Sequence, residues 1–235
     1  MTPNPAHSPT ALDRDQPQLV LASSSPARRK LLQDAGLVFE VQPSTVDEQA
    51  VLAAAQSQQQ APHHGADWAP LTPAQTAQLL AVAKARQVAQ DWADCPALIL
   101  GCDSVFEFAG QAYGKPYQLH TARERIRMIS GKSGLLHTGH HLIFSQGSHR
   151  WQEVSELRTA RVYFDTLTPE EIEAYLASGE PLWVAGSFTI DGFGSAFIRQ
   201  IEGEYHTVVG LSVNALRAMM SSFGQPISNF WTKTP

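Results

Sequence analysis

Hydroxyl and guanidinium side chains stand close together near residue 25, where Ser23 and Ser25 precede Arg28 and Arg29. The apolar run before them predicts a buried strand, Ser25 is a good N-cap, and Pro26 suits the first position of a helix. The N-terminus of a helix attracts anions through its free N–H groups and dipole. The segment is therefore typical of a phosphate-binding strand-to-helix junction, although a capped helix whose arginines point into water has the same pattern.

Asp103 is a second unusual residue, because it stands inside the apolar run 97–105. That run predicts a buried strand, where an ionised carboxylate is costly unless a metal ion or a cationic side chain stabilises it. Gly101, two residues earlier, allows another backbone or a ligand to approach closely. Conflicts of this kind are typical of functional sites, and the alternative is an aspartate at a strand bulge that accepts backbone hydrogen bonds.

Three further charged residues could join such a site. Asp47 and Glu48 follow an extended segment, so they could ligate a hard cation through oxygen or form an exposed acidic turn. Lys84 lies on the apolar stripe of a helix predicted over residues 72–91. Its ammonium group therefore either snorkels to the rim of the core or reaches a buried anion.

Two loops carry the remaining candidates. Lys115 stands in a Gly-Lys-Pro sequence directly after a predicted hairpin over residues 97–113, where it could contact a phosphate oxygen. The glycine-punctuated segment 185–194 lets backbone groups approach a base or a sugar, or it is a plain connection. Asp191 in this segment could accept hydrogen bonds from the edge of a nucleobase, or it is a turn residue before Gly192.

The composition limits the class of protein to which these residues belong. The length of 235 residues favours one domain, and 17 Lys and Arg against 22 Asp and Glu give a net charge of −5, so we expect neither a nucleic-acid polymer nor a membrane as partner. No apolar run approaches the roughly 20 residues of a membrane-spanning helix. Because the two cysteines are too few for a disulfide scaffold and the N-terminus lacks a signal-peptide pattern, we expect a cytoplasmic protein.

The order of predicted elements indicates a mixed α/β domain, because strands alternate with helices and include at least one antiparallel hairpin. The strands are expected at residues 19–22, 97–105, 111–113, 135–144 and 151–164, and the helices after Ser25, over 72–91 and 121–129, after Thr168 to about 178, and from Ser212 to about 221. This pattern predicts a sheet covered by helices.

The domain boundaries follow from changes in composition. Residues 1–18 are expected to be a disordered tail, because they are polar, rich in Pro and Asp, and show no apolar period. The single domain covers residues 19–222, and residues 223–235 form a C-terminal tail. Within the domain, residues 49–71 are rich in Ala, Gln, His and Pro and are predicted to be a mobile surface insertion.

Taken together, these residues resemble the Maf family of nucleoside triphosphate pyrophosphatases. The resemblance covers about residues 19–222, apart from the insertion. It rests on Ser23-x-Ser25-Pro26 with Arg28, Asp47-Glu48, Lys84, Asp103, Gly114-Lys115-Pro116, Ser130-Gly131, His137-Thr138-Gly139, Glu171-Ile172, Gly179-Glu180-Pro181-Leu182, Ala185-Gly186 and Gly203-Glu204-Tyr205-His206-Thr207-Val208-Val209-Gly210-Leu211.

This resemblance implies both a fold and an activity. The fold is an elongated mixed sheet flanked by helices, with two lobes around a central cleft, similar to the inosine triphosphate pyrophosphatases. The activity is hydrolysis of a non-standard, modified or pyrimidine nucleoside triphosphate to the monophosphate and pyrophosphate, with Mg²⁺ or Mn²⁺ as cofactor, in a homodimer. The alternatives are a nucleotide-binding regulator of cell division and septum formation, and a phosphatase that releases orthophosphate.

The resemblance also implies roles for the candidate residues. Asp103, Lys84 and Lys115 would be catalytic; Glu48 and Asp103 would hold the metal; and Ser23, Ser25, Arg28, Arg29, Thr138 and Asp191 would bind the substrate. Whether Asp103 activates water or ligates the metal stays open. The chain departs from the family at Ala27, where one of two arginines is lost unless Arg29 replaces it, and at Asp191, where well-known members have Gln in the loop that helps to recognise the base.

Overall fold

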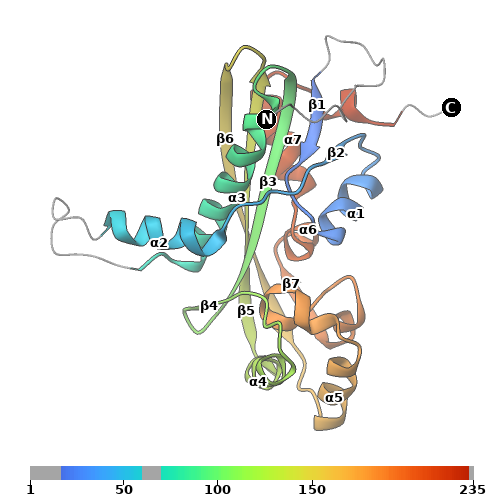
Figure 1. Ribbon diagram of the computed structural model, residues 1–235. Helices are drawn as coiled ribbons and strands as arrows, with labels where there is room; N and C mark the ends of the chain where they lie inside the picture. Colours follow the sequence, from blue (N-terminus) through green and yellow to red (C-terminus); the bar gives the residue numbers. More distant parts are fainter. Residues whose placement is uncertain (1–16, 60–69, 233–235) are drawn as a thin grey trace.

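In a computed structural model, which describes residues 17–59 and 70–232, three long antiparallel strands form the centre of the molecule (Figure 1). The sheet has the order β2-β1-β3-β5-β6-β7, with β4 paired to β3. β1 runs parallel to both β2 and β3, and the other pairs are antiparallel. The strands are β1 (Gln18–Leu21), β2 (Glu40–Val41), β3 (Pro96–Phe108), β4 (Gln111–Tyr113), β5 (Ser133–Gln146), β6 (Trp151–Phe164) and β7 (Ile198–Glu202).

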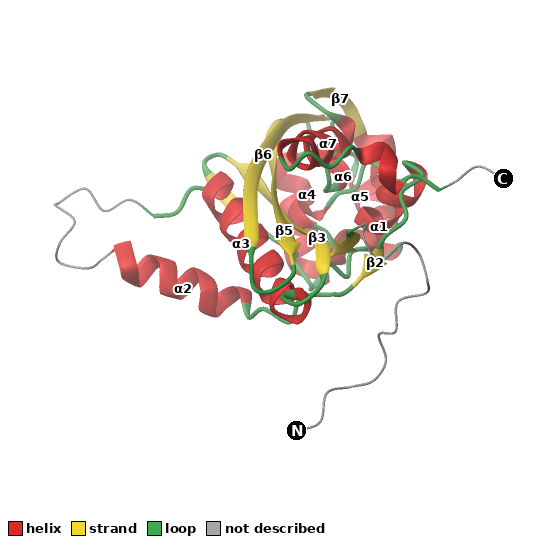
Figure 2. Ribbon diagram, turned by 90° about the horizontal axis from the view of Figure 1, so that it is seen from above, coloured by secondary structure: helices red, strands yellow, loops and turns green. Residues whose placement is uncertain are grey.

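Helices cover both faces of this sheet (Figure 2). One face carries α1, α4, α5, α6 and α7, the other carries α3, and α2 extends sideways from α3. The helices are α1 (Pro26–Asp34), α2 (Glu48–Gln59), α3 (Pro73–Ala89), α4 (Leu119–Ile129), α5 (Pro169–Ala177), α6 (Tyr205–Val209) and α7 (Val213–Ser222). The predicted mixed-sheet fold covered by helices is therefore confirmed. Within the described ranges, no helix is both long and apolar enough to cross a bilayer.

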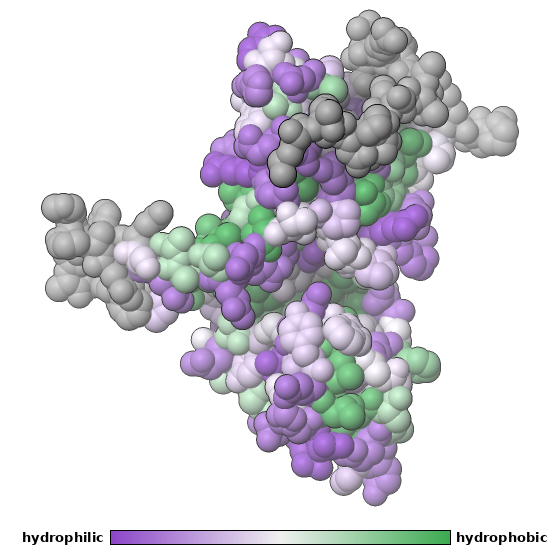
Figure 3. Space-filling model, in the orientation of Figure 1, coloured by the Kyte–Doolittle hydropathy of each residue, from purple (hydrophilic) through white to green (hydrophobic). Residues whose placement is uncertain are grey.

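The apolar run of β3 is explained by these two layers. Leu98 and Leu100 pack towards α1 and α7, whereas Ile99 between them packs towards α3. A strand that is covered on both faces has no solvent-facing side, so its amino-acid sequence is continuously apolar. Farther along the sheet, Phe106 and Phe188 belong to a separate core. The molecule therefore has two lobes along the same strands, and its surface is hollowed between them (Figure 3).

Four helices begin at the polar residues that predict their starts. The side chains of Ser25, Thr72, Thr168 and Ser212 each accept a hydrogen bond from a backbone N–H of the first turn of the helix that follows. A side-chain oxygen at this position satisfies a backbone donor that the helix itself leaves free. These starts could be predicted because the stabilising contact lies within three residues of sequence.

The chain differs from expectation at the predicted insertion and at the C-terminal tail. Residues 48–59 form α2 within the region predicted to be a mobile insertion, because Ala and Gln favour helix and the side chain of Asp47 accepts a hydrogen bond from Ala50 N at 3.0 Å. Residues 60–69 lie outside the described residues, as do residues 1–16 of the N-terminal tail. In the C-terminal segment, Phe230 is buried in the core and Trp231 bridges to Leu37, so burial of an aromatic side chain places this segment in the domain.

α3 lies directly on the sheet because two glycines allow close approach. A Cβ atom added to Gly101 would lie 2.2 Å from the carbonyl oxygen of Ala81, and one added to Gly139 would lie 2.6 Å from that of Ala77. Any side chain at these two positions would push the helix away. This contact sets how far Lys84 of α3 stands from the strand that carries Asp103.

Candidate active site

The candidate site lies where β3 continues past the end of β1. The pairing of β1 with β3 ends at Leu21 and Leu100, and the pairing of β4 with β3 begins at Phe106. Residues 101–105 of β3 therefore pair with β5 on one edge, and no other strand of the described chain pairs with their second edge. This open edge lies between the two lobes, and Asp103 and Ser104 stand on it.

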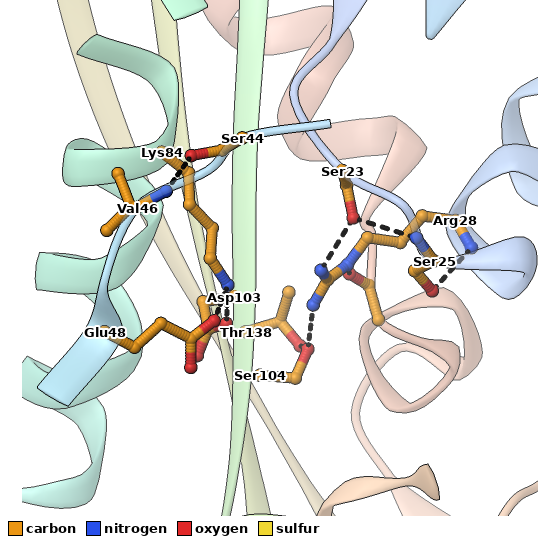
Figure 4. A network of polar contacts seen from close by, with 11 residues as sticks. Ser23, Ser25, Arg28, Ser44, Val46, Glu48, Lys84, Asp103, Ser104 and Thr138 are labelled. Carbon is orange, nitrogen blue, oxygen red and sulfur yellow. Dashed lines mark hydrogen bonds and ion pairs between the residues drawn. The ribbon is translucent and has the colours of Figure 1, made fainter. Parts of the chain in front are cut away.

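Asp103 forms an ion-pair cluster with Lys84 and Glu48 on the α3 face of the sheet (Figure 4). The ammonium nitrogen of Lys84 lies 2.5 Å from Oδ1 of Asp103 and 2.7 Å from Oε1 of Glu48. The side chains of Lys84 and Asp103 are each 13% exposed, whereas that of Glu48 is 52% exposed. Lys84 thus reaches a buried anion instead of snorkelling, and the cluster has one side open to solvent.

Burial gives Asp103 an unusual protonation equilibrium. The loss of hydration raises the pKa of its carboxyl group above the ordinary value, although the positive charges of Lys84 and Arg28 act against this shift. A carboxyl group with a raised pKa is a better proton acceptor once it is ionised.

Arg28 forms the second cluster, on the face that α1 covers (Figure 4). Its Nε donates to the carbonyl oxygen of Gly210 at 2.7 Å, and its two terminal nitrogens donate to Ser23 Oγ at 3.2 Å and to Ser104 Oγ at 3.0 Å. Ser25 caps α1 by accepting from the backbone N–H of Arg28. The guanidinium group is therefore buried and fixed, and it joins the hydroxyl group of Ser23, just after the end of β1, to that of Ser104 within β3.

Thr138 supports this cluster from the neighbouring strand. It lies opposite Ser104 in the register of β3 and β5, its Oγ1 is 2.9 Å from Ser104 Oγ, and it donates to the carbonyl oxygen of Thr207 at 2.8 Å. Sequence reasoning missed Ser104 and assigned no role to Thr207 or Gly210. The available signal was the polar pair Asp103-Ser104 inside an apolar strand, because the side chains of two successive strand residues point to opposite faces of the sheet.

Three candidate residues lie apart from these clusters. Arg29 is exposed and lines a hollow with Gln33 and Phe39, so it does not stand beside Arg28 as a replacement for the arginine missing at Ala27. Asp191 is exposed and lines another hollow with Lys30 and Tyr205 on α1 and α6. Lys115 is exposed in the loop between β4 and α4, and it forms no ion pair with any described residue.

The same residues fit a divalent cation that arrives with a phosphate ligand. Mg²⁺ is commonly held by one or two carboxylates together with substrate phosphates, and Glu48 and Asp103 supply two hard oxygen donors around one point. Lys84 occupies the space between them and balances their charge. Over residues 17–59 and 70–232, no group of three or more His, Cys, Asp and Glu side chains could hold a metal by itself.

Comparison with known proteins identifies the relatives of this chain. Residues 18–223 match the sequence model of the Maf family, described as Maf-like protein. A protein of Leifsonia xyli named nucleoside triphosphate pyrophosphatase is 44% identical over 92% of this chain and 97% of its own length. Relatives with the same name from Synechococcus sp. strain JA-2-3B'a(2-13) and Streptomyces coelicolor are 40% and 43% identical, over 92% and 91% of this chain and 99% and 94% of their own lengths.

Similarity to solved structures is much weaker. A HAM1 protein from Coxiella burnetii matches over 91% of this chain and 96% of its own, with 15% identity and a TM-score of 0.36, which is too low to support an argument. The sequence comparisons are decisive by themselves, because the family match spans nearly the whole described chain. This chain belongs to the Maf family.

Proposed function

We propose that this protein hydrolyses a nucleoside triphosphate to a nucleoside monophosphate and pyrophosphate. The observation that carries the proposal is the meeting of the Arg28 cluster and the Lys84–Asp103–Glu48 cluster at one open edge of β3. The names of the relatives that match over nearly their full length support the same activity. A triphosphate tail laid along this edge would meet cationic groups on one side and a buried carboxylate on the other.

The cationic residues neutralise the triphosphate. Arg28 is held in a fixed orientation by three hydrogen bonds, so it binds phosphate oxygens with little loss of side-chain entropy. Lys115 comes from the opposite lobe: β4 pairs Tyr113 with Phe106 in antiparallel register, so the chain that follows continues towards the level of Ser104. The two lobes thereby provide cations from both sides of the open edge.

Asp103 acts on the attacking water. Its raised pKa and its place on the strand edge support a role as general base, which accepts a proton while the water oxygen bonds to the α-phosphorus. The bond between the α-phosphorus and the bridging oxygen then breaks, and pyrophosphate leaves with the electron pair of that bond. Lys84 keeps the carboxylate oriented through its short contact with Oδ1.

Glu48 and Asp103 would hold Mg²⁺ or Mn²⁺ together with phosphate oxygens. A bound divalent cation supplies charge neutralisation at the phosphate oxygens. The proposal extends to a non-standard, modified or pyrimidine nucleotide as substrate and to a homodimeric assembly. Asp191, in place of the usual glutamine, is assigned to contacts that select the substrate.

One assay tests the reaction. Purified protein is incubated with ordinary and modified nucleoside triphosphates, with and without Mg²⁺, and mono- and diphosphate products are separated while pyrophosphate and orthophosphate are quantified. We expect monophosphate and pyrophosphate in equal amounts, only with the cation. Release of orthophosphate with a diphosphate product would refute the proposal in favour of a phosphatase, and tight binding without any product would favour a nucleotide-binding regulator.

A further inference from the structure

Two aromatic side chains stand in solvent on the lobe that carries α4 and α5. Tyr117 is 60% exposed and Trp183 is 64% exposed, and their ring centroids lie 5.8 Å apart with a T-shaped angle of 75°. Single exposed apolar side chains are common on protein surfaces, whereas adjoining ones that form a patch are typical of a binding site. An exposed pair in contact therefore indicates a surface that receives a flat apolar ligand or a partner.

Hydrogen bonds hold the backbone of the loop that carries Tyr117. Tyr117 has a φ of 59°, a left-handed conformation that bulky residues rarely adopt, and its N–H donates to the carbonyl oxygen of Leu182 at 3.1 Å. Arg125 of α4 donates to the carbonyl oxygen of Gly114 at 2.6 Å and fixes the start of the same loop. A strained conformation that the surroundings maintain is typical of a functional position.

Trp183 stands on an equally fixed support. It ends the 3₁₀ helix Glu180–Trp183, whose first residue accepts hydrogen bonds from Tyr175 Oη at 2.9 Å, from Phe193 N at 2.9 Å and from Gly194 N at 3.0 Å. These contacts tie the 3₁₀ helix to α5 and to the glycine-punctuated loop. The rings are therefore presented on rigid backbone, which reduces the entropy that a ligand must overcome to bind them.

The position of the pair connects it with the candidate site. Tyr117 follows Lys115 by two residues, and Lys115 follows a strand whose register runs towards Ser104. Figure 1 shows the loop between β4 and α4 along the edge of the lower lobe that faces the upper lobe, and Figure 3 shows the surface hollowed at that level. A ligand whose phosphates contact Lys115 would have its other end within reach of the two rings.

We propose that Tyr117 and Trp183 form a stacking platform for the nucleobase of the substrate, in which the base lies on the face of one ring and against the edge of the other, because the two rings are nearly perpendicular. The inference rests on the proposed function and adds the residues that receive the base. Stacking on an aromatic face accepts any base, because every base has a π-face. The platform would therefore contribute affinity for nucleotides as a class, and the choice among bases would come from polar groups at the base edge.

The test distinguishes binding of the base from binding of the phosphates. The variants Trp183→Ala and Tyr117→Ala are compared with Trp183→Phe and Tyr117→Phe, which keep an aromatic face, and with Leu157→Ala, which removes an exposed apolar side chain from β6. The readouts are KM and kcat for pyrophosphate release and the inhibition constant of inorganic tripolyphosphate, which has no base. We expect each alanine variant to raise KM about tenfold. In the same variants, kcat and the inhibition constant of tripolyphosphate should change less than threefold. The phenylalanine variants and Leu157→Ala should keep the KM of the parent protein.

Two outcomes would overturn the platform. One is an unchanged KM in both alanine variants, or an equal loss of affinity for tripolyphosphate, which would show that the rings only support Lys115. The other is a lower molar mass of Trp183→Ala in light scattering, which would show that the rings form an interface between protein chains.

Failure of the platform is distinguishable from failure of the proposed function. If the parent protein releases no pyrophosphate from any nucleotide, the proposed function fails, and the platform is tested by tryptophan fluorescence. Quenching by nucleoside triphosphates, absent with tripolyphosphate and reduced in Trp183→Phe, would support base stacking without any turnover. Equal quenching by both compounds, or no quenching, would refute it.

Discussion

Asp103 and Ser104 are adjacent on β3, and their side chains leave opposite faces of the sheet: Asp103 accepts a hydrogen bond from Lys84, and Ser104 accepts one from Arg28. Successive residues of a strand always alternate in this way. Two neighbouring residues therefore join α3 on one layer to α1 on the other. The arrangement functions only because β3 has an open edge at this level, so that a single ligand can touch both faces.

Asp103→Asn should remove the proton acceptor and keep the shape of the side chain. We expect kcat for pyrophosphate release to fall by about 10² to 10⁴. The free energy of unfolding should fall as well, because the largely buried ammonium group of Lys84 then keeps only Glu48 as a charged partner. Asp94→Asn, at an exposed position, is the matched control and should keep full activity. Undiminished turnover by Asp103→Asn would refute its role as a base.

Substitutions of Arg28 and of Arg29 should have very different effects on activity and stability, although the two residues are neighbours in sequence. Arg28→Ala removes three hydrogen bonds at a buried position and should lower kcat/KM at least tenfold and the free energy of unfolding by about 1–3 kcal/mol. Arg28→Lys should recover only part of the activity, because one ammonium cannot reach all three acceptors. Arg29→Ala, at an exposed position, should change neither quantity. Equal losses in both arginine variants would contradict the assignment.

Glu48→Gln should weaken the binding of the divalent cation. We expect the Mg²⁺ concentration for half-maximal activity to rise by about tenfold or more, since even indirect partners of a metal site have effects of that size. High Mg²⁺ should restore most of the activity. Glu40→Gln, at an exposed position on β2, is the control. Identical activity with and without a chelator would refute the proposed role of the divalent cation.

Gly101→Ala tests whether the contact between α3 and the sheet positions Lys84. The new Cβ would lie 2.2 Å from the carbonyl oxygen of Ala81, so α3 must move. We expect unfolding in urea to show a loss of about 1–3 kcal/mol, together with lower activity. Gly114→Ala meets no atom within 4 Å and should leave the free energy of unfolding nearly unchanged. A Gly101→Ala protein of normal stability would show that the helix accommodates the methyl group.

His140 should make the protein less stable in mild acid. Burial lowers the pKa of this histidine from 6.5 to about 4, and its Nε2 accepts the backbone N–H of Ser212 at 2.8 Å, which requires the neutral ring. The unfolded chain binds a proton between these pH values and the folded chain does not, so stability is present above about pH 6.5 and is lost towards pH 4. The loss from this residue is on the order of 3 kcal/mol.

The matching measurement is the free energy of unfolding in urea from pH 7.5 to pH 4.5. His140→Gln offers an amide oxygen to Ser212 and cannot titrate. The free energy of unfolding of this variant should therefore depend less steeply on pH than that of the parent protein. Some dependence should remain, because burial also lowers the pKa of His141. An unchanged slope in His140→Gln would contradict the buried neutral histidine.

Local signals explain the parts of the fold that could be predicted. The helix starts at Ser25 and Thr168 depend on contacts within three residues, and the apolar run of β3 follows from burial on both faces. The helix over residues 48–59 escaped prediction because its low-complexity composition is shared by loops and helices. The segment near Phe230 escaped prediction because its stability comes from a core formed by residues far away in the sequence.

By itself, the sequence determined which residue types are available for phosphate chemistry, because charge and hydroxyl groups in an apolar context are visible without coordinates. Only the tertiary structure decided which of them meet. The choice of Arg28 over Arg29 depends on which side of α1 faces the sheet, and the partnership of Asp103 with Lys84 depends on how closely α3 approaches Gly101. These are distances between segments far apart in the chain, and they are set by packing, which a local pattern does not encode.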